Sequence, residues 1–159
     1  MIPSVQTFCV AHAIPFHIQL CGSVPSLREF YGQEGPRKRQ GAVAIIRVFL
    51  VRQIYVEITG RETWRSITVG EGHVNPLPPV GLDEPSQGDV AVDWEGTVRC
   101  ENDITSGTFS IGHLTVKDFI MLAVTPASSS HLLPVQHGQP IRLVTDSWEE
   151  QGQVHPRDR

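Results

Sequence analysis

Residues 43–58, VAIIRVFLVRQIYVEI, constrain the fold of this chain more than any other stretch. Eight of these sixteen residues are β-branched, and β-branched side chains lose rotamer freedom in a helix but pack well on a pleated strand. Arg47 and Arg52 interrupt an apolar run that is already shorter than the roughly 20 residues that a membrane-spanning helix needs. The stretch therefore predicts a long core strand of a soluble domain.

Side chains on this strand are expected to alternate between two faces. The even positions are apolar except for Arg52, so they predict a face that covers a core. The odd positions mix Phe49, Val51 and Tyr55 with charged and amide side chains. They predict a half-exposed second face, which is a candidate contact surface.

Arg52 is a charge on an apolar face, and Asp118 holds the same kind of position in the predicted strand at 114–124. A buried charge normally needs a partner, so we expect these two side chains to pair with each other or with Arg142. The alternative is that both charges lie in water at a strand end or a sheet edge.

The composition favours an all-β domain, because 14 Gly and 12 Pro in 159 residues suit short strands joined by turns. We expect an antiparallel immunoglobulin-like β-sandwich of seven to eight strands with at most one short helical turn, which begins at Ser26; an up-and-down barrel is the alternative. Thr59 and Gly60 predict a hairpin turn after the long strand. The expected strands cover residues 5–12, 14–20, 43–58, 63–69, 92–100, 109–114, 114–124 and 140–145.

The length predicts one domain, at 14–148. A segment at 1–13 that holds an edge strand precedes it, and a polar, disordered tail at 149–159 follows it. A loop rich in Pro and Gly is expected at 70–90 inside the domain.

Charge and cysteine content limit the classes of function. The formal net charge of -4 gives no electrostatic footprint for nucleic acid. Three cysteines are too few for a disulfide framework, and the N-terminal residues lack the basic start and the uninterrupted apolar run of a signal peptide. These features predict a cytoplasmic protein.

Two short motifs are candidate partner-binding sites. The basic run of Arg37, Lys38 and Arg39 could serve nuclear import or bind phosphate, and a solvated loop tip is the simpler interpretation. Pro76 and Pro79 satisfy a PxxP pattern that docks on aromatic grooves when it is exposed, and a rigid turn is the simpler interpretation there.

No catalytic motif is present, and we expect no enzyme, no cofactor and no metal site. Cys9, His12, His17 and Cys21 look like a zinc set on paper. In extended backbone, however, Cys9 and His12 point to opposite faces, and His17 and Cys21 lie about 13 Å apart. A shared zinc site would therefore need a sharp bend, which Pro15 could provide.

Taken in order, six segments resemble the arrestin-like proteins of fungi: IPFHIQLCGSVPSLREFYG, VAIIRVFLVRQIYVEITG, GHVNPLPP, DWEGTVRC, LTVKDFIMLAV and PIRLVTDSW. The resemblance covers residues 14–148 and implies a β-sandwich of the arrestin type. It also implies a cytoplasmic adaptor for endocytosis and protein transport, which links membrane cargo such as transporters or receptors to ubiquitin ligases or the endocytic coat. The chain has room for one of the two lobes of a full arrestin, and residues 78–81, PPVG, lack the tyrosine of the ligase-recruiting P-P-x-Y motif.

A lectin-like sandwich that binds carbohydrate or another small ligand is the alternative from a different class. It would need aromatic side chains grouped on an open face, and the candidates Tyr31, Trp64 and Trp148 are scattered along the sequence. A metal-dependent enzyme built on the histidines is the third hypothesis.

Overall fold

The computed structural model describes residues 6–31, 45–77, 89–101, 104–127 and 130–145, and these form eight strands and one helix. The elements in chain order are β1 (Gln6–Cys9), β2 (Ile14–Ser23), α1 (Val24–Tyr31), β3 (Ile45–Ile58), β4 (Arg61–Pro76), β5 (Asp89–Val98), β6 (Phe109–Ile111), β7 (Leu114–Thr125) and β8 (Val135–Val144). The prediction of an all-β chain is confirmed.

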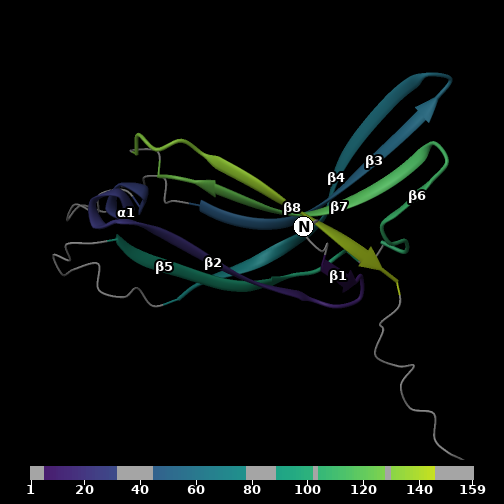
Figure 1. Ribbon diagram of the computed structural model, residues 1–159. Helices are drawn as coiled ribbons and strands as arrows, with labels where there is room; N and C mark the ends of the chain where they lie inside the picture. The colour runs from purple at the N-terminus through teal and green to yellow at the C-terminus, as the bar shows by residue number, and fades with distance from the viewer. Residues whose placement is uncertain (1–5, 32–44, 78–88, 102–103, 128–129, 146–159) are drawn as a thin grey trace, which may run out of the picture.

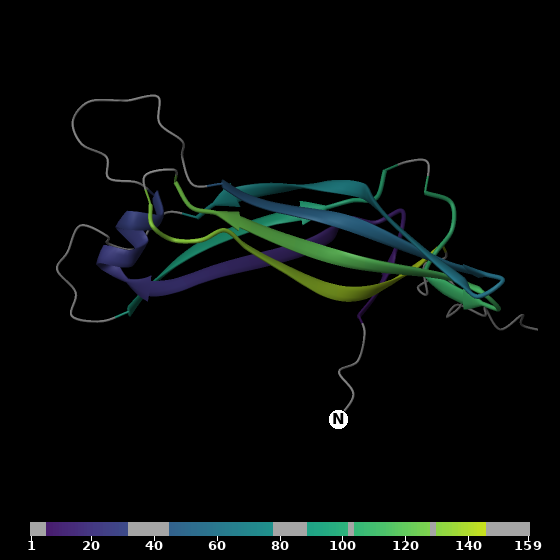
Figure 2. The same ribbon diagram turned by 90° about the horizontal axis from the view of Figure 1, so that it is seen from above.

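The strands form two layers, and β4 runs from one layer into the other (Figure 1, Figure 2). The hydrogen-bonded order is β1-β8-β7-β3-β4-β5-β2, with β6 added to β7. Every pairing among the described strands is antiparallel except that of β1 with β8, which is parallel. The expectation of a wholly antiparallel arrangement is therefore wrong at this pairing. A parallel pair needs a long connection, and β1 and β8 have nearly the whole described chain between them.

The strand β4 changes layer at two glycines. Its first part pairs with β3 as far as Glu71, and its last part pairs with β5 from Gly72 to the strand end at Pro76. A Cβ atom on Gly72 would lie 2.8 Å from the carbonyl oxygen of Val48, so only glycine fits this close approach. The prediction of a loop from residue 70 onward is therefore wrong for residues 70–76, which belong to β4. The glycines that suggested a loop instead let the strand cross between the layers. Residues 78–88 lie outside the described part.

The predicted hairpin between β3 and β4 is confirmed. Ile58 lies opposite Arg61, and the two residues between them, Thr59 and Gly60, both have positive φ angles, of 51° and 75°. Two positive φ angles define the type I′ turn, whose twist matches the twist of paired strands. This turn fixes which side chains of the two strands share a face.

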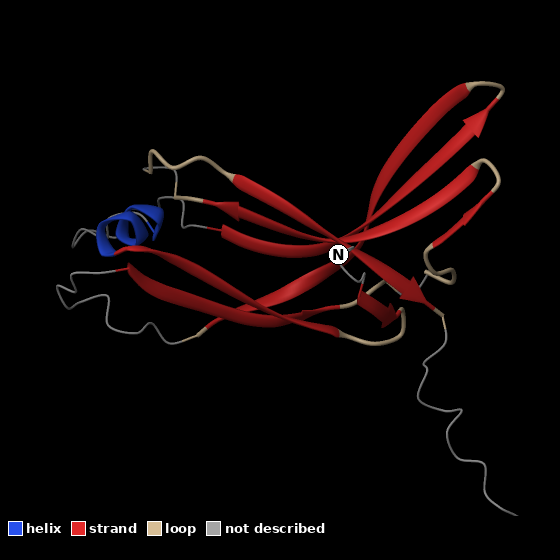
Figure 3. Ribbon diagram, viewed as in Figure 1, coloured by secondary structure: helices blue, strands red, loops and turns tan. Residues whose placement is uncertain are grey.

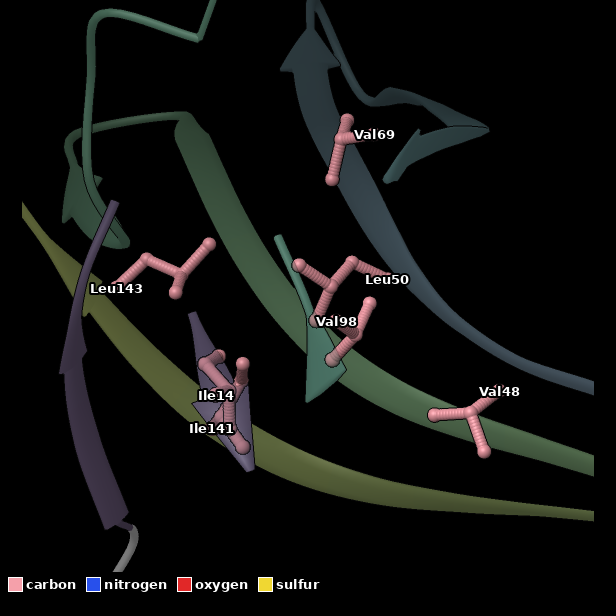
Figure 4. Close-up of a cluster of buried hydrophobic side chains, with 7 residues drawn as sticks. All are labelled: Ile14, Val48, Leu50, Val69, Val98, Ile141 and Leu143. Carbon is pink, nitrogen blue, oxygen red and sulfur yellow. The ribbon is translucent and has the colours of Figure 1, made fainter. Parts of the chain in front are cut away.

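The core lies between the two layers, and β3 contributes its even face to it. Val48 and Leu50 are buried there (Figure 4). Side chains from both layers point toward one another in Figure 4, namely Ile14, Val48, Leu50, Val69, Val98, Ile141 and Leu143. The even face of β3 is thus the core face in this part of the strand, as its sequence pattern predicts.

The helix α1 closes one end of the molecule (Figure 1). Its eight residues exceed the single turn expected, and it begins at Val24, before Ser26. The cap is Ser23, whose Oγ accepts a hydrogen bond from the Ser26 backbone N–H at 3.4 Å. Leu27 and Phe30 are buried against Val92 and Trp94. This second cluster extends the core under the helix.

The two layers differ in length. The strands β3 and β4 have 14 and 16 residues, whereas β2 and β5 have 10 each. At about 3.3 Å per residue, β3 extends roughly 46 Å and β2 roughly 33 Å. The hairpin of β3 with β4 and the hairpin of β6 with β7 therefore project past the second layer (Figure 3). We call residues 53–66 and 109–117 the arm.

Candidate functional site

A buried ion pair lies at the base of the arm. Arg52 on β3 and Asp118 on β7 are direct cross-strand partners, with exposed fractions of 5% and 1%. Arg52 donates from Nε to Asp118 Oδ1 at 2.8 Å and from Nη2 to Oδ2 at 3.1 Å. The sequence predicted this pairing as one of three outcomes, beside a pairing with Arg142 and a position of both charges in water. Arg142 is itself exposed.

The segment that precedes β6 completes this site. Ser106 accepts hydrogen bonds from Arg52 through its backbone carbonyl, at 2.8 Å, and through its hydroxyl, at 3.3 Å. Thr108 donates its hydroxyl to Asp118 at 2.6 Å and accepts the backbone N–H of Leu143 at 2.8 Å. No buried side-chain nitrogen or oxygen among the described residues lacks a hydrogen-bond partner. The pair therefore ties β3, β7 and β8 together and serves as a structural joint.

The charges of this joint act on the thiol of Cys100. Burial, and then the negative charge of Asp118, raise the pKa of the Cys100 thiol above its ordinary value of 9.0, while Arg52 acts in the opposite direction. A raised pKa keeps the thiol protonated at neutral pH, and the protonated form is a poor nucleophile. The site thus lacks the activated thiol that covalent catalysis would require.

Beyond Arg52, the even face of β3 continues onto the arm, and we call this side of the arm its inner face. Ile54 lies opposite Val116, and Val56 lies opposite Leu114. The even face was expected to cover a core along its whole length. Val116 is still buried near the base of the arm, but the second layer does not extend to the tip of the hairpin (Figure 3). Ile58 at the hairpin tip is consequently 65% exposed.

Further apolar and basic side chains share the inner face. Phe109 and Ile111 of β6 pair with the inner-face residues of β7, and they are 39% and 70% exposed. On β4, Arg61 lies opposite Ile58 and Arg65 lies opposite Ile54, so both arginines are on the inner face. Neither of these guanidinium groups forms an ion pair or a hydrogen bond with another described residue.

The opposite side of the arm, its outer face, has a different character. Tyr55 and Trp64 are cross-strand partners whose ring centroids lie 4.5 Å apart, and Trp64 is 57% exposed. Partial burial, and then the carboxylates of Glu62 and Glu57, raise the pKa of Tyr55 above its ordinary value of 10.0. The outer face thus carries acidic and aromatic groups, whereas the inner face carries apolar and basic ones.

Nearer the core, the odd face of β3 is half-exposed, as its sequence pattern predicts. Phe49 and Val51 are half-buried. The guanidinium carbon of Arg47 lies 5.6 Å from the ring centroid of Phe49, and Arg47 also pairs with Glu71 at 2.6 Å. The most exposed apolar side chain of β3, Ile58, therefore lies on the inner face, on the side of the strand whose sequence pattern predicts a core face.

The other residues singled out from the sequence do not form a site in the described part. Arg37, Lys38, Arg39 and Pro79 lie outside the described residues, and Pro76 is exposed at the end of β4.

The zinc-like set does not assemble either, because no three His, Cys, Asp or Glu side chains of the described residues gather as metal ligands would. His17 instead lies 3.1 Å from Asp93, on the neighbouring strand β5.

Sequence reasoning missed the inner face of the arm as a candidate site. The alternation of Arg61 and Arg65 around Thr63 was a visible signal, since residues two apart on a strand share a face. What the sequence did not reveal was that the opposing layer ends before these residues.

Comparisons with known proteins give no family. No family model matches the chain, and no curated protein or solved structure matches it. Among the described residues, no helix has the length and apolar character needed to cross a membrane.

Proposed function

We propose that this chain is a non-enzymatic protein-interaction domain of the arrestin-like kind. In this proposal it acts in the cytoplasm as an adaptor that links membrane cargo, such as transporters or receptors, to ubiquitination or endocytosis. The order of the strands is the observation that carries the proposal, and the resemblance of the sequence segments agrees with it.

The strand order supports an immunoglobulin-like sandwich. In that fold the second, fifth and fourth strands are neighbours in one sheet, and the third, sixth and seventh are neighbours in the other. The short strand β6 lies off the main path, so β7 and β8 correspond to the sixth and seventh strands of that fold. Here β2, β5 and β4 are neighbours in one layer, and β3, β7 and β8 are neighbours in the other. The first strand, β1, joins β8. An arrestin lobe is a sandwich of this general class, so the connectivity agrees with the resemblance.

The chemistry of the described residues also favours binding over catalysis. The one fully buried pair of charges is saturated with hydrogen bonds, and the half-buried thiol near it is held in its protonated form. The projecting arm instead exposes apolar, aromatic and basic side chains. Exposed apolar patches of this kind mark interaction sites.

The experiment that tests this proposal is affinity purification with the full chain as bait, from a detergent extract of the cells that express it. An unrelated β-sandwich domain of similar charge serves as the control bait, and enrichment is measured by quantitative mass spectrometry. We expect membrane transporters or receptors, ubiquitin ligases or coat components to be enriched over the control. Enrichment of none of these classes would contradict the adaptor function.

Carbohydrate binding is the second candidate, and the stacked pair of Tyr55 and Trp64 favours it. An exposed aromatic ring beside carboxylates and hydroxyl groups, such as those of Ser110 and Thr115, is a surface on which a sugar ring can stack. A glycan array probed with the wild-type chain and with Trp64→Ala separates the two functions. Glycan binding that disappears in Trp64→Ala would support this second candidate.

A further inference from the structure

The inner face of the arm presents apolar side chains to solvent. Ile58 and Ile111 are more than half exposed, and Phe109 is 39% exposed. Val56 and Leu114 lie opposite one another on the same face and are half-buried. The apolar surface therefore extends across three neighbouring strands, which is larger than the single exposed hydrophobic residues that most proteins carry.

Two arginines add positive charge to this apolar surface. Arg61 and Arg65 both extend from the inner face, and neither has a partner among the described residues. The carboxylates of the same hairpin, Glu57 and Glu62, lie on the outer face. Guanidinium groups form strong charge-assisted hydrogen bonds with carboxylates, so the inner face complements a ligand that combines acidic and apolar groups.

A second copy of the chain and a lipid surface fit this face less well than a peptide does. A twofold contact would place the inner face against itself and bring the arginines of the two copies together. An anionic membrane would meet the whole tip of the hairpin, including the carboxylates of Glu57 and Glu62, which it would repel. A peptide segment can occupy the inner face alone.

The spacing of the arginines indicates an extended ligand. Arg61 and Arg65 are four residues apart on one strand, which corresponds to about 13 Å. A second extended chain laid along β4 matches this spacing with acidic residues at two positions four apart and an apolar residue midway between them. Charges on β4 disfavour its use as an edge for strand addition, so side-chain contacts with the face carry the recognition.

We infer that the inner face of the arm binds an extended segment of a partner protein that carries acidic residues at two positions four apart and an apolar residue midway between them. The carboxylates of that segment bind the guanidinium groups of Arg61 and Arg65, and its apolar side chain packs over Thr63 against Val56 and Ile58 of the neighbouring strand β3. This inference rests on the proposed interaction function and names the surface and the partner chemistry for it.

The test uses the full chain and a fluorescein-labelled synthetic peptide of about nine residues, with Glu at two positions four apart, Ile between them and Ser elsewhere. Fluorescence anisotropy measures its affinity for the wild-type chain and for Arg61→Glu/Arg65→Glu. We expect saturable binding by the wild type and a loss of at least about tenfold on the double reversal. Arg65→Gln, which removes one charge without adding another, should give a smaller loss.

The matched control is Lys117→Glu, because Lys117 is an exposed cation on the outer face of the same arm, opposite Gln53. This reversal changes the net charge as much as Arg65→Glu does, and it should leave the affinity unchanged. A second peptide with Gln in place of Glu should bind at least about tenfold more weakly. Thermal melts of all variants check that each one is folded.

Several results would overturn the inference. One is equal affinity of the wild type and the double reversal for the peptide, and another is an equal loss of affinity in Lys117→Glu. The others are a dimer that Arg65→Glu dissociates in sedimentation, and binding to phosphatidylserine vesicles that depends on Arg61.

The bait experiment separates this inference from the function proposed above. If wild-type and Arg61→Glu/Arg65→Glu baits enrich the same transporters or ligases, the inference fails and the function stands. If neither bait enriches them while the peptide still binds, the function fails.

Discussion

Arg52 and Asp118 lie where the two layers part, and their burial explains why they must be paired. An unpaired charge in the interior would lose its hydration without compensation. Each of the two charges makes several hydrogen bonds, and Thr108 links the carboxylate to the backbone of β8. At the scale of single residues, the joint therefore depends on both partners being present.

We expect Asp118→Ala to lower the free energy of unfolding by about 3 to 5 kcal/mol, because it leaves the Arg52 guanidinium buried without its carboxylate. Urea denaturation measures the change. Glu71→Ala is the control, since it breaks an ion pair whose two side chains are 57% and 61% exposed, and it should cost less than about 1 kcal/mol. A denaturation midpoint that is the same for Asp118→Ala and the wild type would contradict the structural role of the pair.

Replacement of both charges tests the same joint in the opposite direction. Arg52→Met/Asp118→Leu removes the two buried charges together, and burial of apolar groups of similar volume is often neutral or stabilising. We therefore expect the double variant to be more stable than Asp118→Ala by thermal melting. A double variant that is less stable than Asp118→Ala would indicate that Ser106 and Thr108 do not tolerate the loss.

The Cys100 thiol gives a prediction about pH. Because its pKa is raised in the folded chain, the unfolded chain loses this proton first as the pH rises. The contribution to stability is therefore intact below about pH 9 and is lost as the pH rises through the folded pKa. We expect the fall in urea midpoint between about pH 8 and 10 to be larger for the wild type than for Cys100→Ser. Equal falls would contradict the raised pKa.

At the scale of elements, the hairpin between β3 and β4 orients the inner face. The type I′ turn needs two residues with positive φ, and glycine suits the second of them. Thr59 at the first position is a β-branched residue in a conformation that such residues rarely adopt. This turn is therefore a place where the sequence retains strain.

We expect Thr59→Asn to raise the free energy of unfolding by up to about 1 kcal/mol, because Asn tolerates positive φ and is common in this turn. The urea midpoint measures the gain. Thr63→Asn is the control, because the same substitution within β4 places a residue with poor strand propensity in a strand and should destabilise the chain. A lower midpoint for Thr59→Asn would show that Thr59 is not strained.

Local sequence patterns predicted which strands and helices exist better than the residues at which they begin and end. Alternation identified β3 and its core face, and Thr59 with Gly60 identified the hairpin, because both signals depend on nearby residues. The start of α1 and the second half of β4 were missed. Gly70 and Gly72 look like turn residues, yet they lie within a strand because other backbone segments approach them closely. Such contacts are set by tertiary structure, which a local pattern does not contain.

At the scale of the whole molecule, the unequal lengths of the two layers create the candidate site. The inner face has the same apolar pattern as the core face, and it becomes a surface only because β2 and β5 end earlier than β3 and β4. The buried ion pair was accessible to sequence reasoning because a charge on an apolar face requires a partner. The exposed inner face was not, since its exposure depends on which strands oppose each other.

Both proposals require the arm to be a preformed sheet, and hydrogen–deuterium exchange of the free chain tests this most directly. In the arm β3 is paired on both sides, with Tyr55 opposite Trp64 on β4 and opposite Thr115 on β7. We therefore expect the amides of residues 53–56 to exchange slowly, on the timescale of Val48 and Leu50 in the core. Exchange at the rate of an unfolded chain in residues 53–56, with protection retained in the core, would contradict the account.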